Sequence, residues 1–139
     1  MQEDYSPARS YGPARPLMVN GREITGETEL SEREYFQLFA QRPGMYIGYG
    51  SVRGVVCFLD GYDFAARRHG EQGLNGFREW ILAHHGRRES NLVWWALIED
   101  IALPDKEFGV DRTPEQEAQL MAAIFELLDR FLADRESAV

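Results

Sequence analysis

The sequence contains a single cysteine, a single lysine and no long apolar run. Because Cys57 has no second cysteine to pair with, no intramolecular disulfide can form, and a reducing cytoplasm is the expected location. No segment approaches the length of about 18 apolar residues that a membrane span needs, so we expect none. The first residues, Met-Gln-Glu-Asp, begin no apolar stretch, so we also expect no secretory signal.

Motifs of catalysis and metal binding are also scarce. The 139 residues predict one domain, too short for a barrel enzyme or a two-domain dehydrogenase. His69, His84 and His85 lack the Cys-x-x-Cys or His-Glu-x-x-His spacing of a zinc site, so we expect no metal. Cys57 stands among apolar residues and is expected to be an inert core thiol. We therefore expect no catalytic residues and no cofactor.

Basic residues are outnumbered, and the imbalance lies in one part of the chain. The 15 Lys and Arg residues face 23 Asp and Glu residues, which gives a net charge of −8. This balance excludes a general nucleic-acid binder, which must neutralise phosphates. Residues 1–89 hold 12 acids and 11 bases, whereas residues 90–139 hold 11 acids and 4 bases. The last third therefore carries −7, and a basic partner is expected to bind there.

The hydrophobic residues, 44% of the chain, recur mainly at helical spacing. Residues 1–30 are expected to form a flexible N-terminal arm, in which Asn20-Gly21 predicts a short hairpin over 17–25. Residues 31–135 are expected to form one helical domain. The predicted fold is therefore all-α: a single-domain bundle of about five helices behind a flexible or hairpin-like arm.

Capping residues and helix breakers locate the five helices. Ser31 with Glu34 is a capping box, and Pro43-Gly44 ends the helix that follows it. The other expected N-caps are Ser51, Asn75, Ser90 and Thr113, the last followed by Pro114 at N1 and Gln116 at N3. The C-terminal ends of these four helices are expected at Gly70, Gly86, Pro104 and about Asp134. For 92–98 a strand is the alternative, but the continuing apolar pattern favours a helix over 91–103.

The segment Arg42-Pro-Gly-Met-Tyr-Ile-Gly48 is the most distinctive motif. It resembles a box that lines the nucleotide pocket in the B subunit of DNA gyrase and related ATPases. That family completes its site with an Asn paired to a catalytic Glu and with a glycine-rich lid, which this sequence lacks. From the residues alone, Pro-Gly breaks a helix and Met-Tyr-Ile docks on the bundle. The alternative is a small ligand- or nucleotide-binding regulator or enzyme with a pocket at Arg42, Met45, Tyr46 and Tyr62.

A longer pattern extends from Tyr35 to Leu132. It comprises a short aromatic helix, the same box, and then Phe58-Leu-Asp-Gly-Tyr62, Phe77-x-x-Trp80 and Phe125-Glu-Leu-Leu-Asp-Arg-Phe131. This pattern resembles small uncharacterised bacterial proteins, some of which occur alongside toxin or defence genes. The resemblance implies a shared fold and an association with immunity or defence, and it implies no catalytic residues.

The acidic last third supplies the candidate binding site. Trp94 and Trp95 cannot face the same way on a helix, so both pack in the core or one lies at an interface rim. We predict a non-enzymatic protein-binding module, an immunity protein that masks the active cleft of a basic toxin or nuclease domain with an acidic surface. The candidate partner contacts are Trp95, Glu99, Asp100, Asp105, Glu107 and Asp111.

Overall fold

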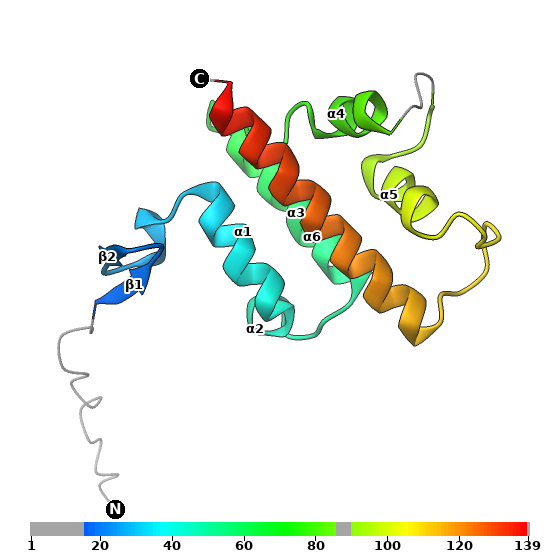
Figure 1. Ribbon diagram of the computed structural model, residues 1–139, viewed down its shortest axis with the longest axis horizontal. Helices are drawn as coiled ribbons and strands as arrows, with labels where there is room; N and C mark the ends of the chain where they lie inside the picture. Colours follow the sequence, from blue (N-terminus) through cyan, green and yellow to red (C-terminus); the bar gives the residue numbers. More distant parts are fainter. Residues whose placement is uncertain (1–15, 86–89, 139) are drawn as a thin grey trace, which may run out of the picture.

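The structure is a computed structural model that describes residues 16–85 and 90–138. Within these residues the chain forms six α-helices and one small antiparallel hairpin (Figure 1). The helices are α1 (Glu32–Gln41), α2 (Pro43–Ile47), α3 (Val52–Arg68), α4 (Phe77–His84), α5 (Trp94–Ala102) and α6 (Pro114–Ser137). The hairpin pairs β1 (Leu17–Val19) with β2 (Arg22–Ile24), and the 3₁₀ turn η1 (Glu27–Glu29) precedes α1. The prediction of an all-α single domain is confirmed.

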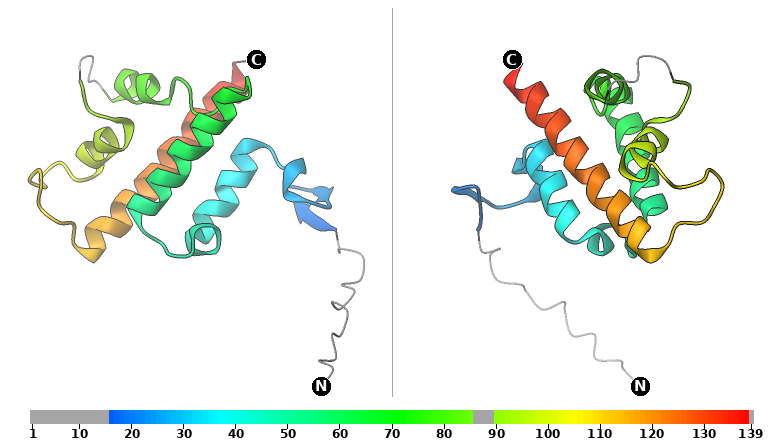
Figure 2. Two further views of the ribbon diagram at one scale, coloured as in Figure 1. Left: turned by 180° about the vertical axis from the view of Figure 1, so that it is seen from behind. Right: turned by 45° about the vertical axis from the view of Figure 1, so that its right-hand side comes forward.

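The long helix α6 is central to the fold. Its first turn has the predicted capping box, in which Thr113 Oγ1 accepts the N–H of Gln116 and the Gln116 side chain accepts the N–H of Thr113. Helix α3 runs behind α6, α1 lies on one side, and α4 and α5 lie on the other (Figures 1 and 2). Seven residues of α6 are buried, so this helix supplies side chains to both halves of the core.

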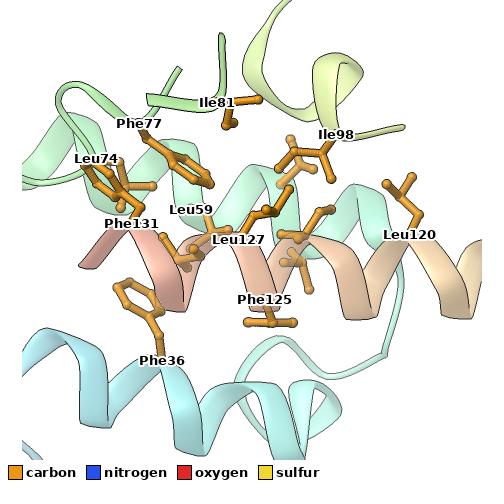
Figure 3. Close-up of a cluster of buried hydrophobic side chains, with 14 of the residues drawn as sticks. Phe36, Leu59, Leu74, Phe77, Ile81, Ile98, Leu120, Phe125, Leu127 and Phe131 are labelled. Carbon is orange, nitrogen blue, oxygen red and sulfur yellow. The ribbon is translucent and has the colours of Figure 1, made fainter. Parts of the chain in front are cut away.

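The hydrophobic core extends across α6 in both directions (Figure 3). Phe36 of α1 lies on the side of α6 that carries Phe125, whereas Phe77, Ile81 and Ile98 of α4 and α5 lie on the opposite side. All five side chains are buried. Burial of a side chain of this size contributes about 1.5–3 kcal/mol. Tertiary packing of this kind stabilises helices that are too short to be stable alone.

The N-terminal arm contains a hairpin within the predicted range 17–25. Asn20 (φ 48°) and Gly21 (φ 77°) are both left-handed, the geometry of the type I′ turn that an Asn-Gly pair favours. Ile24, at the end of β2, is buried, with 3% of its surface exposed. Residues 1–15 of the arm lie outside the described residues.

Glu34 connects the hairpin to α1. It completes the predicted capping box, since its Oε1 accepts the N–H of Ser31 at 3.0 Å while Ser31 Oγ accepts the N–H of Glu34. The same carboxylate accepts hydrogen bonds from Asn20 Nδ2 at 3.1 Å and from the guanidinium of Arg22. These bonds, first the one from Ser31, hold the pKa of Glu34 below its usual value. One carboxylate thus caps α1 and fastens the turn of the hairpin.

Two short helices differ from the predicted boundaries. The one-turn helix α2 follows α1 directly, because Pro43 occupies its N1 position, where the missing N–H breaks no hydrogen bond. Helix α4 begins after Gly76 (φ 88°) and not after Asn75. The predicted end of this helix at Gly86 lies outside the described residues, and α4 ends at His84.

Helix α5 confirms the helical interpretation of the apolar run, but it begins at Trp94 rather than at Asn91. The guanidinium of Arg78 in α4 donates to the carbonyl oxygens of residues 90 and 92, the latter at 2.8 Å. These bonds hold the preceding segment against α4. Val93, with extended φ and ψ of −67° and 160°, becomes the N-cap.

Candidate functional site

A cleft of about 720 Å³ opens between α5, the loop that follows it and the first turns of α6. The loop, residues 103–113, leaves α5 at the buried Leu103 and passes around the outside of the two helices (Figure 1). The residues lining the cleft are Leu92, Trp95, Ala96, Glu99, Asp100, Leu103, Lys106, Glu107, Phe108, Gly109, Val110, Asp111, Arg112 and Glu117. Its walls therefore combine carboxylates with apolar side chains.

Most of the predicted partner contacts are brought together in this cleft. Five of the six line it, namely Trp95, Glu99, Asp100, Glu107 and Asp111. The sixth, Asp105, is exposed in the same loop outside the lining. The residues come from α5 and from the loop, so the acidic stretch of the sequence folds back on itself to form one surface.

The adjacent tryptophans have different surroundings. Trp94 packs 5.6 Å from Phe77 between ring centroids, and its Nε1 donates to Asp60 Oδ1 at 2.9 Å. Trp95 lines the cleft, and both rings also pack against the hydrophobic core. Trp95 therefore gives the cleft an aromatic wall that the core holds in place.

An ion-pair network fastens the loop to the two helices. Glu99 of α5 pairs with Lys106 Nζ and with Arg112 Nη1, each at 3.2 Å. Arg112 Nε also donates to Glu117 Oε2 of α6 at 2.7 Å. The Lys106 side chain is 9% exposed and that of Glu99 is 19% exposed, so salt screens their attraction less than that of surface pairs. Glu99, a predicted partner contact, thus already has two cationic partners within the chain.

Glu117 extends this network to a third helix. Its Oε1 accepts the N–H of Val52 at 2.8 Å, which satisfies one of the free donors at the start of α3. Partial burial would raise the pKa of Glu117, but the hydrogen bonds from Arg112 and Val52 hold it below its usual value. The charge of Glu117 therefore joins α6, the loop and α3.

The outer part of the cleft remains acidic and exposes apolar side chains. Among the described residues, the lining holds five carboxylates and two cations, a formal net charge of −3. Glu107 and Asp111 are exposed at its rim. Phe108 is 99% exposed and Val110 is 53% exposed. The rim can therefore attract a cation and pack against an apolar group at the same time.

Four important residues of the cleft were not predicted, namely Lys106, Phe108, Arg112 and Glu117. The sequence carried a signal for two of them. Lys106 is the only lysine of the chain, and Phe108 is the only aromatic residue between Trp95 and Phe125. Both stand in an acidic loop, where neither is needed for helix formation. The pairing of the two cations depends on the path of the loop, which spacing alone does not reveal.

The alternative pocket near Arg42–Gly48 is divided by the fold. Met45 is 74% exposed, with its sulfur 3.9 Å from Arg42 Nη1, so the prediction that Met45 docks on the bundle is wrong. Tyr46 does pack inward, 5.6 Å from Tyr35 and 4.9 Å from Phe39 between ring centroids. The one-turn helix α2 turns Tyr46 inward and Met45 outward, because neighbouring residues point about 100° apart.

Tyr62, the fourth residue of that alternative pocket, belongs to the contact between α3 and α1. Its ring lies 5.0 Å from Phe36 in an edge-on arrangement, and its hydroxyl donates to Glu32. Burial, together with this bond to a carboxylate, raises the pKa of Tyr62 well above its usual value. The four residues thus form one exposed pair and two packed tyrosines, and a ligand site near the box stays a prediction.

Cys57 is exposed, so the prediction of a core thiol is wrong. The buried residues of α3 are Val52, Val55, Val56 and Leu59, and Cys57 lies on the other face of the helix. Over residues 16–85 and 90–138, no three His, Cys, Asp or Glu side chains are grouped so that they could hold a metal ion.

Comparison with protein-family models, with curated proteins and with solved structures finds no match to this chain. In the part of the chain that the structure describes, no helix is both long and apolar enough to cross a membrane. The functional conclusion therefore depends on the geometry of the cleft.

Proposed function

We propose that the protein is a non-enzymatic binding module whose acidic cleft accepts a basic segment of a partner protein. The observation that carries this proposal is the convergence of Trp95, Glu107, Asp111 and Phe108 on one cleft, whose described lining has a formal net charge of −3. A cleft of about 720 Å³ has the size of a site for a short segment or a small molecule. Its charge would favour a cationic occupant and speed its association.

We further propose that the natural partner is a basic toxin or nuclease domain, whose active cleft the protein covers. Such domains expose cationic clefts to polyanionic substrates, so an acidic surface with an aromatic rim is complementary to them. The fold supports this role, since the loop that carries Glu107 and Asp111 is fastened by the ion pairs of Glu99 and Glu117. A surface held in place loses less entropy when it binds.

The binding proposal is tested by selection of random peptides displayed on phage against the immobilised full chain. We expect selected peptides to be enriched in Arg and Lys, and their affinity to fall as NaCl rises. The test variant, Glu107→Lys with Asp111→Lys, should no longer bind these peptides. The matched control, Glu23→Lys with Glu71→Lys, changes the net charge equally at exposed positions outside the cleft and should retain them.

Selected peptides with no excess of basic residues would contradict the proposal, as would equal binding to the test variant and the control. Masking of a toxin is tested separately. Affinity purification from the source organism should retrieve a basic protein whose toxic or nuclease activity falls when the chain is added at equal concentration. Activity that stays unchanged in the complex would contradict masking while leaving peptide binding intact.

A further inference from the structure

Phe108 is the most exposed large hydrophobic residue of the described chain. Its exposed fraction is 99%, and the next, Met45, is 74% exposed. A side chain with no cover contributes nothing to the hydrophobic core, so the fold itself does not account for an aromatic residue at this position. Exposed apolar side chains that are rimmed by polar residues are typical of interaction sites. Phe108 has Glu107 beside it and Asp111 three residues on.

The loop presents Phe108 in a restrained position. On one side, Lys106 pairs with Glu99, and the Lys106 N–H donates to the Leu103 carbonyl oxygen at 3.1 Å. On the other side, Arg112 pairs with Glu99 as well. Both ends of the segment 107–111 are therefore attached to the same carboxylate of α5. A loop held in this way loses less backbone entropy on binding than a free loop.

The cleft behind Phe108 is lined by further apolar side chains. Trp95, Leu92 and Val110 line it together with Phe108, while Glu107 and Asp111 contribute negative charge at the rim. A purely cationic occupant would satisfy the carboxylates and leave the aromatic side chains in water. A purely apolar one would leave the carboxylates without a cation. The occupant that suits both is a basic segment with an apolar side chain among its Arg or Lys residues.

We infer that Phe108 is the anchor of the interface, packing with Trp95 around an apolar side chain of an amphipathic basic segment. This inference rests on the proposed function and adds the chemistry of the occupant to it. In interfaces of this kind a few aromatic residues dominate the affinity, and the surrounding charges act mainly on specificity and on association rate. Removal of Phe108 should therefore weaken binding even though every charge of the cleft is retained.

Two synthetic peptides of equal length and charge test the inference. One alternates Arg with Leu, and the other alternates Arg with Ser. We expect the wild-type chain to bind the Arg/Leu peptide at least about tenfold more tightly than the Arg/Ser peptide, measured by fluorescence anisotropy. Phe108→Ala should abolish this preference, and Phe108→Trp should retain it. Phe64→Ala is the matched control, because Phe64 is also exposed but lies on α3 outside this cleft.

Circular dichroism of each variant verifies that the fold is retained, which is expected because Phe108 makes no core contact at 99% exposure. Equal affinity for the two peptides, or an unchanged preference in Phe108→Ala, would overturn the inference. In those cases salt-sensitive binding of the Arg/Ser peptide would still support the proposed function. Absence of binding by either peptide would overturn both.

Discussion

The pair between Lys106 and Glu99 is expected to contribute more to stability than an exposed pair of the same charge type. The Lys106 Nζ atom lies 3.2 Å from Glu99 Oε1, and only 9% of the lysine side chain is exposed. At this separation and an effective dielectric constant of about 20, the attraction is about 5 kcal/mol before desolvation. Desolvation offsets most of it, and Glu99 keeps Arg112 as a partner. We therefore expect Lys106→Met to lower the free energy of unfolding by about 1.5 kcal/mol.

The matched control is Arg130→Met on α6. Arg130 Nη2 lies 2.9 Å from Glu126 Oε1, yet both side chains are 62% exposed. An exposed pair four residues apart on a helix contributes about 0.3–0.5 kcal/mol. In a chain of this length, 1 kcal/mol corresponds to roughly 4 °C in Tm. We expect Tm to fall by about 6 °C in Lys106→Met and by about 1–2 °C in Arg130→Met, as followed by circular dichroism.

A double-mutant cycle assigns the effect to the pair. In a Glu99→Gln background, Lys106→Met should cost little, because the carboxylate that it pairs with is gone. The reasoning would be refuted if the two single variants, Lys106→Met and Arg130→Met, lost equal stability. A loss in Lys106→Met that persists unchanged in the Glu99→Gln background would also refute it, since the lysine would then act through packing and not through its charge.

Three further predictions concern the stability of the fold and the exposure of its cysteine. A Cβ atom added at Gly73 (φ +54°) would lie 2.7 Å from Asp63 Oδ1, which is too close. A Cβ atom added at Gly70 (φ +80°) would meet no other atom within 4 Å. Gly70→Ala should thus cost about 1 kcal/mol and Gly73→Ala at least about twice that in urea unfolding. Because the fold lowers the pKa of Glu117 from its ordinary value of 4.5, the ionised carboxylate stabilises the fold above pH 4.5, and this stability is lost as the pH falls through the lowered pKa. Glu117→Gln should therefore make the free energy of unfolding depend less on pH in the acid range. The Cys57 thiol, being exposed, should react with a disulfide reagent in the native protein about as fast as in the unfolded chain.

The starts of α1 and α6 were predictable because capping is local. In each capping box, Ser31 with Glu34 and Thr113 with Gln116, the two side chains accept each other's backbone N–H within one turn. The identities of these residues are therefore enough to predict where the helix begins. The start of α5 was not predictable in this way. It depends on Arg78, which holds residues 90 and 92 by their carbonyl oxygens across a distance of more than ten residues in sequence.

The acidic cleft was predictable in composition but not in its internal pairing. Counting charges along the chain located the acidic last third and, with it, four of the carboxylates that line the cleft, whereas Trp95 was predicted from its place beside Trp94. The count treated Glu99 as equivalent to Glu107. In the structure Glu99 pairs with Lys106 and Arg112, whereas Glu107 is exposed at the rim. The difference arises from the fold of a loop of eleven residues, 103–113, which brings both cations back onto α5.

This division between inner and outer carboxylates predicts that salt affects binding and stability differently. The inner pair, Lys106 with Glu99, is largely withdrawn from solvent, so mobile ions screen it weakly. The outer carboxylates Glu107 and Asp111 are exposed and would be screened in full. Raising NaCl from about 50 to about 500 mM should therefore weaken the binding of a basic peptide by several-fold while leaving the urea midpoint nearly constant. Parallel losses of both would mean that the inner network is open to solvent, and the cleft would then lack the fixed wall on which the role of Phe108 depends.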